Sequence, residues 1–459
     1  MKFRISVLIG ISLLFTAPAR LFAVGSGAFE NATFSARSLA QGDAVTAQAD
    51  EPAAISYNPA GIVNLPGIQM QSNGAVISSF TFQSGPDGSQ SKSTGSINFI
   101  PTGYVTINPG CLLGDRVAFG FGSDSPFGLS NKYKSASPIA HYTTYDAWLK
   151  MYTLKPVAAV KVTDWLSLGG GPIYYRIFDF GGVMAYPNQA LGFPFPDGQA
   201  RLNLSGNTWG WHMGALVKPH RQHQFGFYFR SPVTVRARGL VKVENATVGG
   251  NFETGGNVKI NLPLDFTFGY AFKPTERTTI ETDFVYTRWS THRRLFINAD
   301  PVNMFDDAIL SAIGKADKDY NDSFLIGLGA NHKLNKKWTL LGGMDFRWAA
   351  VPEAHFTPSV PDSNRLSVSV GVQYAFTDYL DIALTHYSSF SLTRKIDNDI
   401  SETLGTSVDG RYFSYLQDIV FSATLKWDDV FQRRPTPTRS GCLECQAASV
   451  KTTMPVAVE

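Results

Sequence analysis

Apolar and polar residues alternate with a period of two along most of this chain. From Leu366 to Thr377, valine and aromatic residues alternate with small or polar ones. This period predicts β-strands that present one apolar face to lipid or to a core. A second alternating run, at 258–273, is too long for an ordinary strand of a globular protein. Its length fits a tilted strand that crosses a membrane.

Short turns and long loops also alternate along the chain. The short turns lie at 108–110, 163–164, 218–220, 273–275, 335–336 and 377–378. With a free first strand near Ile68 and a last strand ending near Trp427, these six turns enclose seven hairpin pairs, which predicts fourteen strands. Short turns at one end and long loops at the other are typical of bacterial outer-membrane barrels. We therefore expect an all-β fold: a 14-stranded antiparallel transmembrane β-barrel over residues 67–431, closed by pairing of the last strand with the first.

The N-terminus has the features of a secretory signal. Lys2 and Arg4 precede an apolar run, and small residues follow as far as Ala23. We interpret residues 1–23 as a cleaved signal peptide, with a buried N-terminal helix as the alternative. Of the 40 basic residues, three lie in this segment, so 37 basic and 37 acidic residues remain. That balance does not indicate nucleic-acid binding. Secreted β-sandwiches are the alternative to a barrel.

Two further segments do not alternate. Residues 24–66 are small, polar and poor in charge, which favours a hatch packed inside the lumen over a solvated tail. Residues 432–459 are rich in Pro, Thr and Ser and contain Cys442 and Cys445. We expect this periplasmic tail to be disordered or held by a partner, and its two cysteines to form a local disulfide or to have no role.

Several motifs give a more specific indication. The hatch contains Ala40-x-Gly42-x-Ala44, then Asp50 and the tetrapeptide Asn58-Pro59-Ala60-Gly61. Other motifs are Ser125-Pro126-Phe127-Gly128-Leu129 with Tyr133, the turn region 160–169, and Trp289-Ser290. Over residues 25–431 the sequence resembles the FadL/TodX family of outer-membrane transporters for long-chain fatty acids and other hydrophobic molecules.

The resemblance implies a route for a ligand. A hydrophobic molecule would land between extracellular loops, move to a pocket in the barrel, and leave sideways at a kink in the third strand after the hatch shifts. Asn58, Pro59, Ala60, Gly61 and Asp50 are the expected hatch residues. The loops at 125–148 and 181–202 are rich in aromatic residues and suggest capture of such a ligand, although they could equally pack together as a lid. The residues expected to bind the ligand there are Phe127, Leu129, Tyr133, Phe193 and Phe195.

Two more candidates belong to that route. Gly120 and Gly122 favour a kink in the third strand and thus a lateral gate, with tight wall packing as the alternative. A carboxylate needs a basic partner inside an apolar pocket. The resemblance implies Arg176, on the fifth strand, as the anchor, since a similar place in the family carries a basic residue that points into the lumen. Lys150 and Arg347 are weaker candidates that could be ordinary lumen or interface charges.

No enzyme motif is found, and we expect no enzyme activity, no cofactor and no metal. Glu281 and Asp283 are interpreted as polar lumen residues rather than an acid–base pair. The alternatives to a transporter are a general diffusion porin and a surface adhesin of the outer membrane. The expected partners are a hydrophobic ligand such as a fatty acid, outer-membrane lipids and lipopolysaccharide, and the barrel assembly machinery. We expect a monomer.

Overall fold

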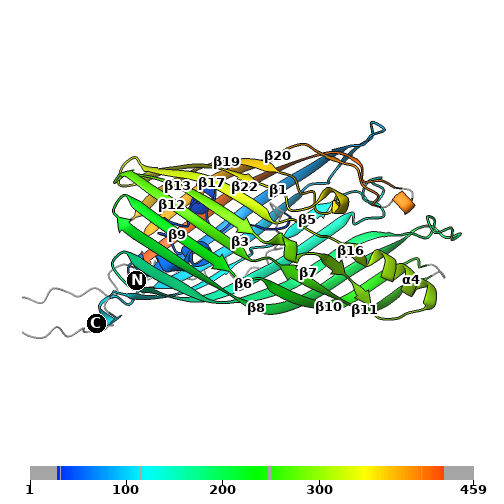
Figure 1. Cartoon of the computed structure of the whole chain (residues 1–459), viewed down its shortest axis with the longest axis horizontal. Coiled ribbons are helices and arrows are strands. Elements are labelled where there is room, and N and C mark those ends of the chain that lie inside the picture. The colour runs from blue at the N-terminus through cyan, green and yellow to red at the C-terminus, as the bar shows by residue number, and fades with distance from the viewer. Residues whose placement is uncertain are drawn as a thin grey trace, which may run out of the picture.

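In the computed structural model of the chain, a wall of tilted strands encloses a lumen (Figure 1). The structure describes residues 28–31, 33–113, 115–246, 250–400, 402–404 and 406–427. The predicted signal peptide and C-terminal tail therefore lie outside the described residues. Among the described residues, no helix is both long and apolar enough to span a membrane.

Fourteen antiparallel strands form the wall, as predicted, and three of them consist of two segments each. In order they are β1 (Ile68–Ser84), β3 (Ser96–Ile107), β4 (Val117–Asp124) with β5 (Leu129–Lys132), β6 (Asp146–Lys161), β7 (Leu166–Tyr186), β8 (Gly198–His220), β9 (His223–Arg230) with β10 (Val233–Glu244), β11 (Phe252–Leu262) with β12 (Asp265–Thr275), β13 (Thr278–Thr287), β17 (Ser323–Lys333), β18 (Trp338–Arg347), β19 (Arg365–Thr377), β20 (Leu380–Ser391) and β22 (Gly410–Trp427). β1 pairs with β22 from Ile68↔Trp427 to Ser84↔Arg411, which closes the barrel.

The wall is polar inside and apolar outside over much of its area. On β19, Ser367 and Ser369 are buried, while Val368 and Val370 between them are exposed. On β8, Trp209 and Met213 are likewise exposed. Large apolar side chains on an outer surface are stable in lipid, so the period-two pattern is explained by a membrane around the wall.

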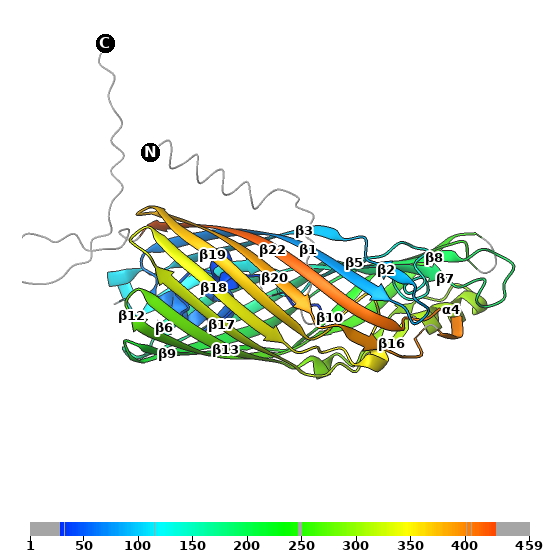
Figure 2. The same cartoon turned by 90° about the horizontal axis from the view of Figure 1, so that it is seen from above.

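The two ends of the barrel differ. Six short turns are found at the end where β1 begins and β22 ends, as predicted. Two of them come slightly later than expected, at 221–222 and 276–277, because 218–220 and 273–275 still belong to β8 and β12. The opposite end carries the long connections, and β7 and β8 extend far into it (Figure 2). Its short elements are β2 (Gln90–Lys92), η3 (Trp289–Thr291), β14 (Arg294–Phe296), β15 (Asn298–Ala299), α4 (Met304–Ile313), β16 (Lys315–Asp317), η4 (Glu353–His355), β21 (Arg394–Ile396) and η5 (Glu402–Leu404). η2 (Gly110–Leu113) lies in the first short turn.

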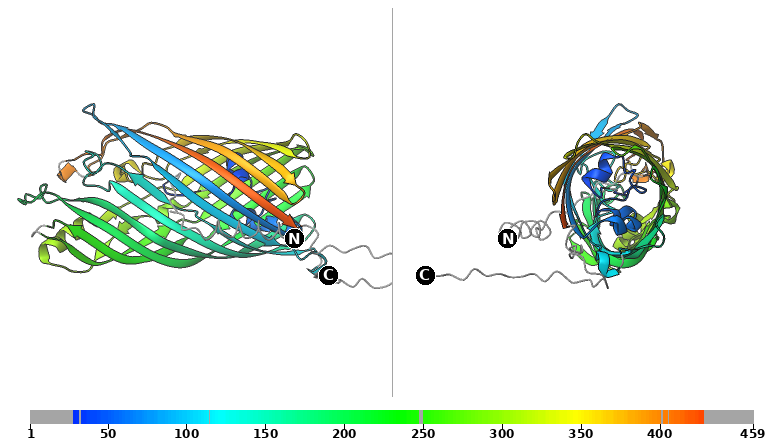
Figure 3. Two further views of the ribbon diagram at one scale, coloured as in Figure 1. Left: turned by 180° about the vertical axis from the view of Figure 1, so that it is seen from behind. Right: turned by 90° about the vertical axis from the view of Figure 1, so that its left-hand side faces the viewer.

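Of the predicted hatch at 24–66, residues 33–66 lie inside the ring of strands (Figure 3), and from here on we call this part the hatch. They form α2 (Ala36–Ala40), α3 (Ala54–Tyr57) and η1 (Pro59–Asn64). The Ala36 amide donates to Ser422 of β22, and Ser369 of β19 donates to the Ala40 carbonyl. On other sides of the lumen, hatch residues bond to β4, β8 and β13. The many alanines and glycines let the hatch backbone approach the wall closely.

Candidate functional site

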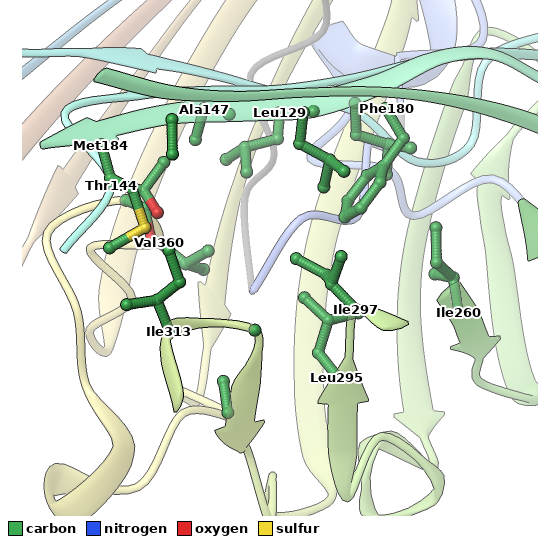
Figure 4. Close-up of a pocket in the computed structure, with 18 of the residues that line it drawn as sticks. Leu129, Thr144, Ala147, Phe180, Met184, Ile260, Leu295, Ile297, Ile313 and Val360 are labelled. Carbon is green, nitrogen blue, oxygen red and sulfur yellow. The ribbon is translucent and has the colours of Figure 1, made fainter. Parts of the chain in front are cut away.

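An apolar cavity of about 200 Å³ lies towards the long-loop end of the lumen. Strands of the wall form one side and the connection between β13 and β17 forms the other. Figure 4 shows side chains from both sides pointing towards each other across the cavity. The labelled apolar residues are Leu129 on β5, Ala147 on β6, Phe180 and Met184 on β7, Ile260 on β11, Leu295 on β14, Ile297, Ile313 on α4 and Val360. Such a lining suits a hydrophobic ligand.

His292 and Lys318 bring polar groups to the same cavity. Both lie in the connection after β13, outside the wall strands. Burial lowers the pKa of His292 to about 4, with a further contribution from Lys318, so this imidazole is neutral at pH 7. Burial also lowers the pKa of Lys318 to about 8. Within the described part of the chain, the Lys318 ammonium has no hydrogen-bond or salt-bridge partner. It is therefore a cation at an apolar pocket without an ion-pair partner among the described residues.

The tetrapeptide at 58–61 fixes the hatch to the wall. The buried Asn58 side chain donates to the carbonyl oxygens of Thr46 at 2.7 Å and of Ala215 on β8 at 3.0 Å. It also accepts from the Ala60 amide at 3.2 Å. Pro59 begins η1, where its missing N–H costs nothing. A Cβ at Gly61 would overlap the carbonyl oxygen of Ala49, so this position requires glycine.

Two carboxylates on β13 hold a second part of the hatch. Asp283 accepts from the amides of Val45 at 3.2 Å and Thr46 at 3.0 Å. Glu281 accepts from Ala47 at 2.5 Å and from the Gln48 amide at 2.9 Å. These residues were expected to be polar lumen residues, and they use that position to bind four backbone donors. Asp50 lies at the edge of the hatch and forms an ion pair with Arg37 at 2.7 Å.

The third wall strand is interrupted between β4 and β5, at residues 125–128. The ladder between β3 and β4 covers only Gly103–Ile107 of β3. Within the described residues, the β3–β4 ladder does not extend along 96–102 of β3. The N-terminal residues 29–31, which we call the N-terminal segment, occupy the interruption. Gly128 donates to the Phe29 carbonyl at 2.8 Å, and Asn31 donates to the Pro126 carbonyl at 2.8 Å.

The predicted gate glycines lie in a regular part of β4, before this interruption. Gly120 and Gly122 have ladder partners on both β3 and β6. An added Cβ at Gly120 would be 2.8 Å from Ile55 of α3, and one at Gly122 would be 2.8 Å from Tyr104. The two glycines thus make room for the hatch, whereas the break in the ladder comes at 125–128.

The structure places Arg176 on the outer face of β7, which corrects its expected position in the lumen. Its neighbours Tyr175 and Ile177 are the buried, inward-facing residues. Tyr174, on the same face as Arg176, packs against the exposed Trp209 with ring centroids 5.1 Å apart. The lumen at this level is lined by apolar and aromatic side chains, so a charged side chain is better placed on the other face. Lys150 pairs with Asp179, and Arg347 pairs with Glu30.

The structure distributes the five predicted loop residues among several environments. Leu129 lines the cavity. Phe127 is fully buried at the strand interruption, and Tyr133 is buried in the same core. Phe193 packs beside α4, whereas Phe195 is exposed. The structure therefore brings only one of the five to the cavity lining.

The connection between β13 and β17 is the part of the cavity lining that the sequence analysis did not identify. It supplies Leu295, Ile297, Ile313 and Lys318. The alternation of Leu295 and Ile297, followed by an apolar helix at 304–313, was the available signal. Among the described residues, no group of three or more His, Cys, Asp or Glu side chains could hold a metal ion.

Comparison with known proteins agrees with this geometry. The profile of the family described as "Outer membrane protein transport protein (OMPP1/FadL/TodX)" matches residues 22–422. The chain belongs to this family. Its members are outer-membrane transport proteins, and the family is not an enzyme family. The resemblance inferred from the sequence motifs and the predicted outer-membrane location are thereby confirmed.

The relatives differ in how much of their length is matched. The chain is 26% identical over 211 residues to the 47 kDa outer membrane protein of Pasteurella multocida. The aligned residues cover 43% of this chain and 47% of that relative. It is 23% identical over 364 residues to the long-chain fatty acid transport protein of Escherichia coli O6:H1, which covers 72% of this chain and 79% of that relative.

Solved structures show the same fold. A Pseudomonas aeruginosa FadL homologue aligns with a TM-score of 0.74 at 19% identity, covering 87% of this chain and 99% of that one. The toluene transporter TodX of Pseudomonas putida aligns with a TM-score of 0.61 at 17% identity, covering 88% and 99%. At this identity the likeness concerns the fold.

Proposed function

We propose that this protein carries long-chain fatty acids, or similar hydrophobic molecules, passively across the outer membrane. One observation carries the proposal: the apolar cavity is lined in part by Phe29, and Phe29 belongs to the segment that fills the interruption of the third strand. A ligand in the cavity thus contacts the residues that cover a potential sideways exit.

Lateral release is supported by the energetics of an alkyl chain. Each methylene group costs about 0.8 kcal/mol to hydrate, so a chain of about fifteen methylenes is about 12 kcal/mol more stable out of water. A route from the apolar cavity to the lipid through the wall at 125–128 avoids that cost. Movement of the hatch and the N-terminal segment would open this route. We assign the lateral gate to this interruption, with Gly120 and Gly122 giving the hatch room beside it.

For the carboxylate of a fatty acid, we propose Lys318 as the anchor in place of Arg176. Its ammonium lies at the cavity without a partner among the described residues, and a carboxylate there would form a charge-assisted hydrogen bond. A toluene-like hydrocarbon, the ligand named for the structurally similar TodX, would use the same cavity without needing Lys318. Comparing an acid with a neutral ligand therefore distinguishes the two classes.

Uptake of labelled hexadecanoic acid tests the proposal. Cells with the protein should take up the label faster than cells without it, and equal uptake would remove the proposal. Ala147→Phe would fill the cavity and slow uptake. Thr234→Phe adds the same side chain on the exposed face of β10 and serves as the matched control.

The same protein in planar bilayers addresses the porin alternative, because a large and steady conductance would favour an open pore. A hatch that contacts many wall strands favours a largely closed channel. Loop exchange that abolishes adhesion but not uptake would favour an adhesin.

We propose no catalytic activity. We also propose that the barrel, which the pairing of β1 with β22 closes, works as a monomer among outer-membrane lipids and lipopolysaccharide after insertion by the barrel assembly machinery.

A further inference from the structure

Glu30, in the N-terminal segment, lies between two arginines of the wall. Arg347 at the end of β18 is 2.8 Å from one of its carboxylate oxygens, and Arg230 at the end of β9 is 3.1 Å from the other. All three side chains are more than nine-tenths buried. A buried carboxylate held by two guanidinium groups is an arrangement suited to any carboxylate, whichever molecule supplies it.

We propose that Arg230 and Arg347 form a second carboxylate site, which Glu30 occupies in the closed state and the carboxylate of the transported acid takes over on its way to the third-strand interruption. This inference rests on the proposed function. It concerns a different site from Lys318, deeper along the same route.

The N-terminal segment has the chemical layout of a short amphipathic acid. Phe29 places an apolar ring at the edge of the cavity and packs on Trp289, with ring centroids 4.7 Å apart. The next residue, Glu30, places a carboxylate on the two arginines. A fatty acid moving from the cavity would present the same two groups in the same order, so it can replace both contacts at once.

The charges at this site favour replacement of Glu30 by an incoming carboxylate over departure of Glu30 with nothing in its place. Arg230 also forms an ion pair with Asp265, but Arg347 would lose its carboxylate partner Glu30 if the segment left alone. A buried charge left without its partner is strongly unfavourable. The Nε atom of Arg230 has no hydrogen-bond partner in the described part of the chain, so a donor is already available for an incoming oxygen.

Exchange at the arginines is coupled to the wall through the backbone. Residues 29 and 31 bond to Gly128 and Pro126 in the interruption, and Glu30 forms a β-bridge with Phe127. Phe127 in turn lies under Arg230, whose guanidinium carbon is 4.6 Å from the ring centroid. Displacing Glu30 therefore weakens the segment's hold on the interruption, and an acid that binds the arginines helps to uncover its own exit.

The experiment compares hexadecanoic acid with hexadecanol, which has the same chain without the charge. Binding of both is measured on purified, folded protein in detergent. Glu30→Gln should raise affinity for the acid about tenfold, because a competing charge-assisted bond is lost, and should leave the alcohol within about twofold. Arg347→Gln should lower the affinity for the acid relative to the alcohol. When it is combined with Glu30→Gln, it should remove the increase in acid affinity that Glu30→Gln causes alone. Lys426→Gln, which neutralises a cation paired with Asp381 on β20, is the matched control and should leave the acid-to-alcohol ratio unchanged.

The outcomes separate the two proposals. Wild-type protein that binds neither ligand would overturn the transport function and this site with it. Wild-type binding of both, with an acid-to-alcohol ratio unmoved by Glu30→Gln and by Arg347→Gln, would overturn the second site alone. An equal change for acid and alcohol would also overturn it, because Glu30 would then act only as a structural latch. If Glu30→Gln fails to fold, the ratio in Arg347→Gln decides the matter.

Discussion

Replacing Asn58 with alanine should loosen the hatch while leaving the barrel folded. The wild-type side chain bridges hatch and wall, because it donates to Thr46 within the hatch and to Ala215 on β8, and it accepts from Ala60. Alanine removes all three bonds and leaves two carbonyl groups and one amide without these partners. The wall ladders do not depend on this side chain.

The magnitude follows from those three bonds. A typical hydrogen bond contributes a net 0.5–1.5 kcal/mol, so their loss amounts to about 2–4 kcal/mol once some water enters. Because 1.4 kcal/mol is a factor of ten, the loosened state of the hatch should become about 30 to 1,000 times more populated.

Amide hydrogen exchange measures this quantity region by region. Peptides covering 45–64 should exchange faster by that factor, while peptides from β17 to β20 keep their wild-type rates. Asn64→Ala is the matched control, since Asn64 is an exposed asparagine at the end of the same η1 helix with one long bond to the Gly61 carbonyl, and it should change little. Wild-type exchange of the hatch in Asn58→Ala would refute the reasoning. Equal acceleration throughout the barrel would also refute it.

Three further predictions follow from single positions. A carboxylate binds the protonated form of Lys318, whose pKa is lowered to about 8. The affinity for hexadecanoic acid should therefore fall as pH rises through 8, while the affinity for hexadecanol stays level. Lys318→Gln should abolish this difference in pH dependence between the two ligands. Gly61→Ala should destabilise the hatch by about 1–3 kcal/mol in hydrogen exchange, whereas Gly342→Ala, which meets only one atom at 3.9 Å, should not. Arg176→Gln, on the outer face, should leave the acid-to-alcohol binding ratio unchanged.

The barrel could be predicted because its pattern is local and repeated. Each wall strand has its own alternation, and each short turn has its own turn residues, so the six turns and fourteen strands could be counted one by one. Lipid outside the wall sets the same requirement for every strand. An error in one segment therefore does not spread to the next.

Side-chain direction at the site was harder to predict, because a shift of one residue moves a side chain to the other face. Arg176 shows this directly: the resemblance to the family favoured a place in the lumen, but its neighbours Tyr175 and Ile177 are the residues that face the apolar lumen at that level. The partners of Glu281 and Asp283 are backbone amides more than 230 residues away in sequence, and no local pattern could reveal them. The same is true of Glu30 and Arg347.

The interruptions of the wall share one sequence feature that connects fold and function. The third strand breaks around Pro126, β9 and β10 are separated around Pro232, and β11 and β12 around Pro263. Proline has no N–H to give to a ladder. At the first break, the Pro126 carbonyl is free to accept from the N-terminal segment. At the other two breaks, Arg230 is the last residue of β9 and Asp265 is the first residue of β12, and the two lie opposite each other in the β9–β12 ladder. Arg230 forms an ion pair with Glu30 of the N-terminal segment. The irregular positions of an otherwise regular wall thus hold the N-terminal segment. The movement that we propose for this segment would break contacts at these positions and leave the ladders between the wall strands in place.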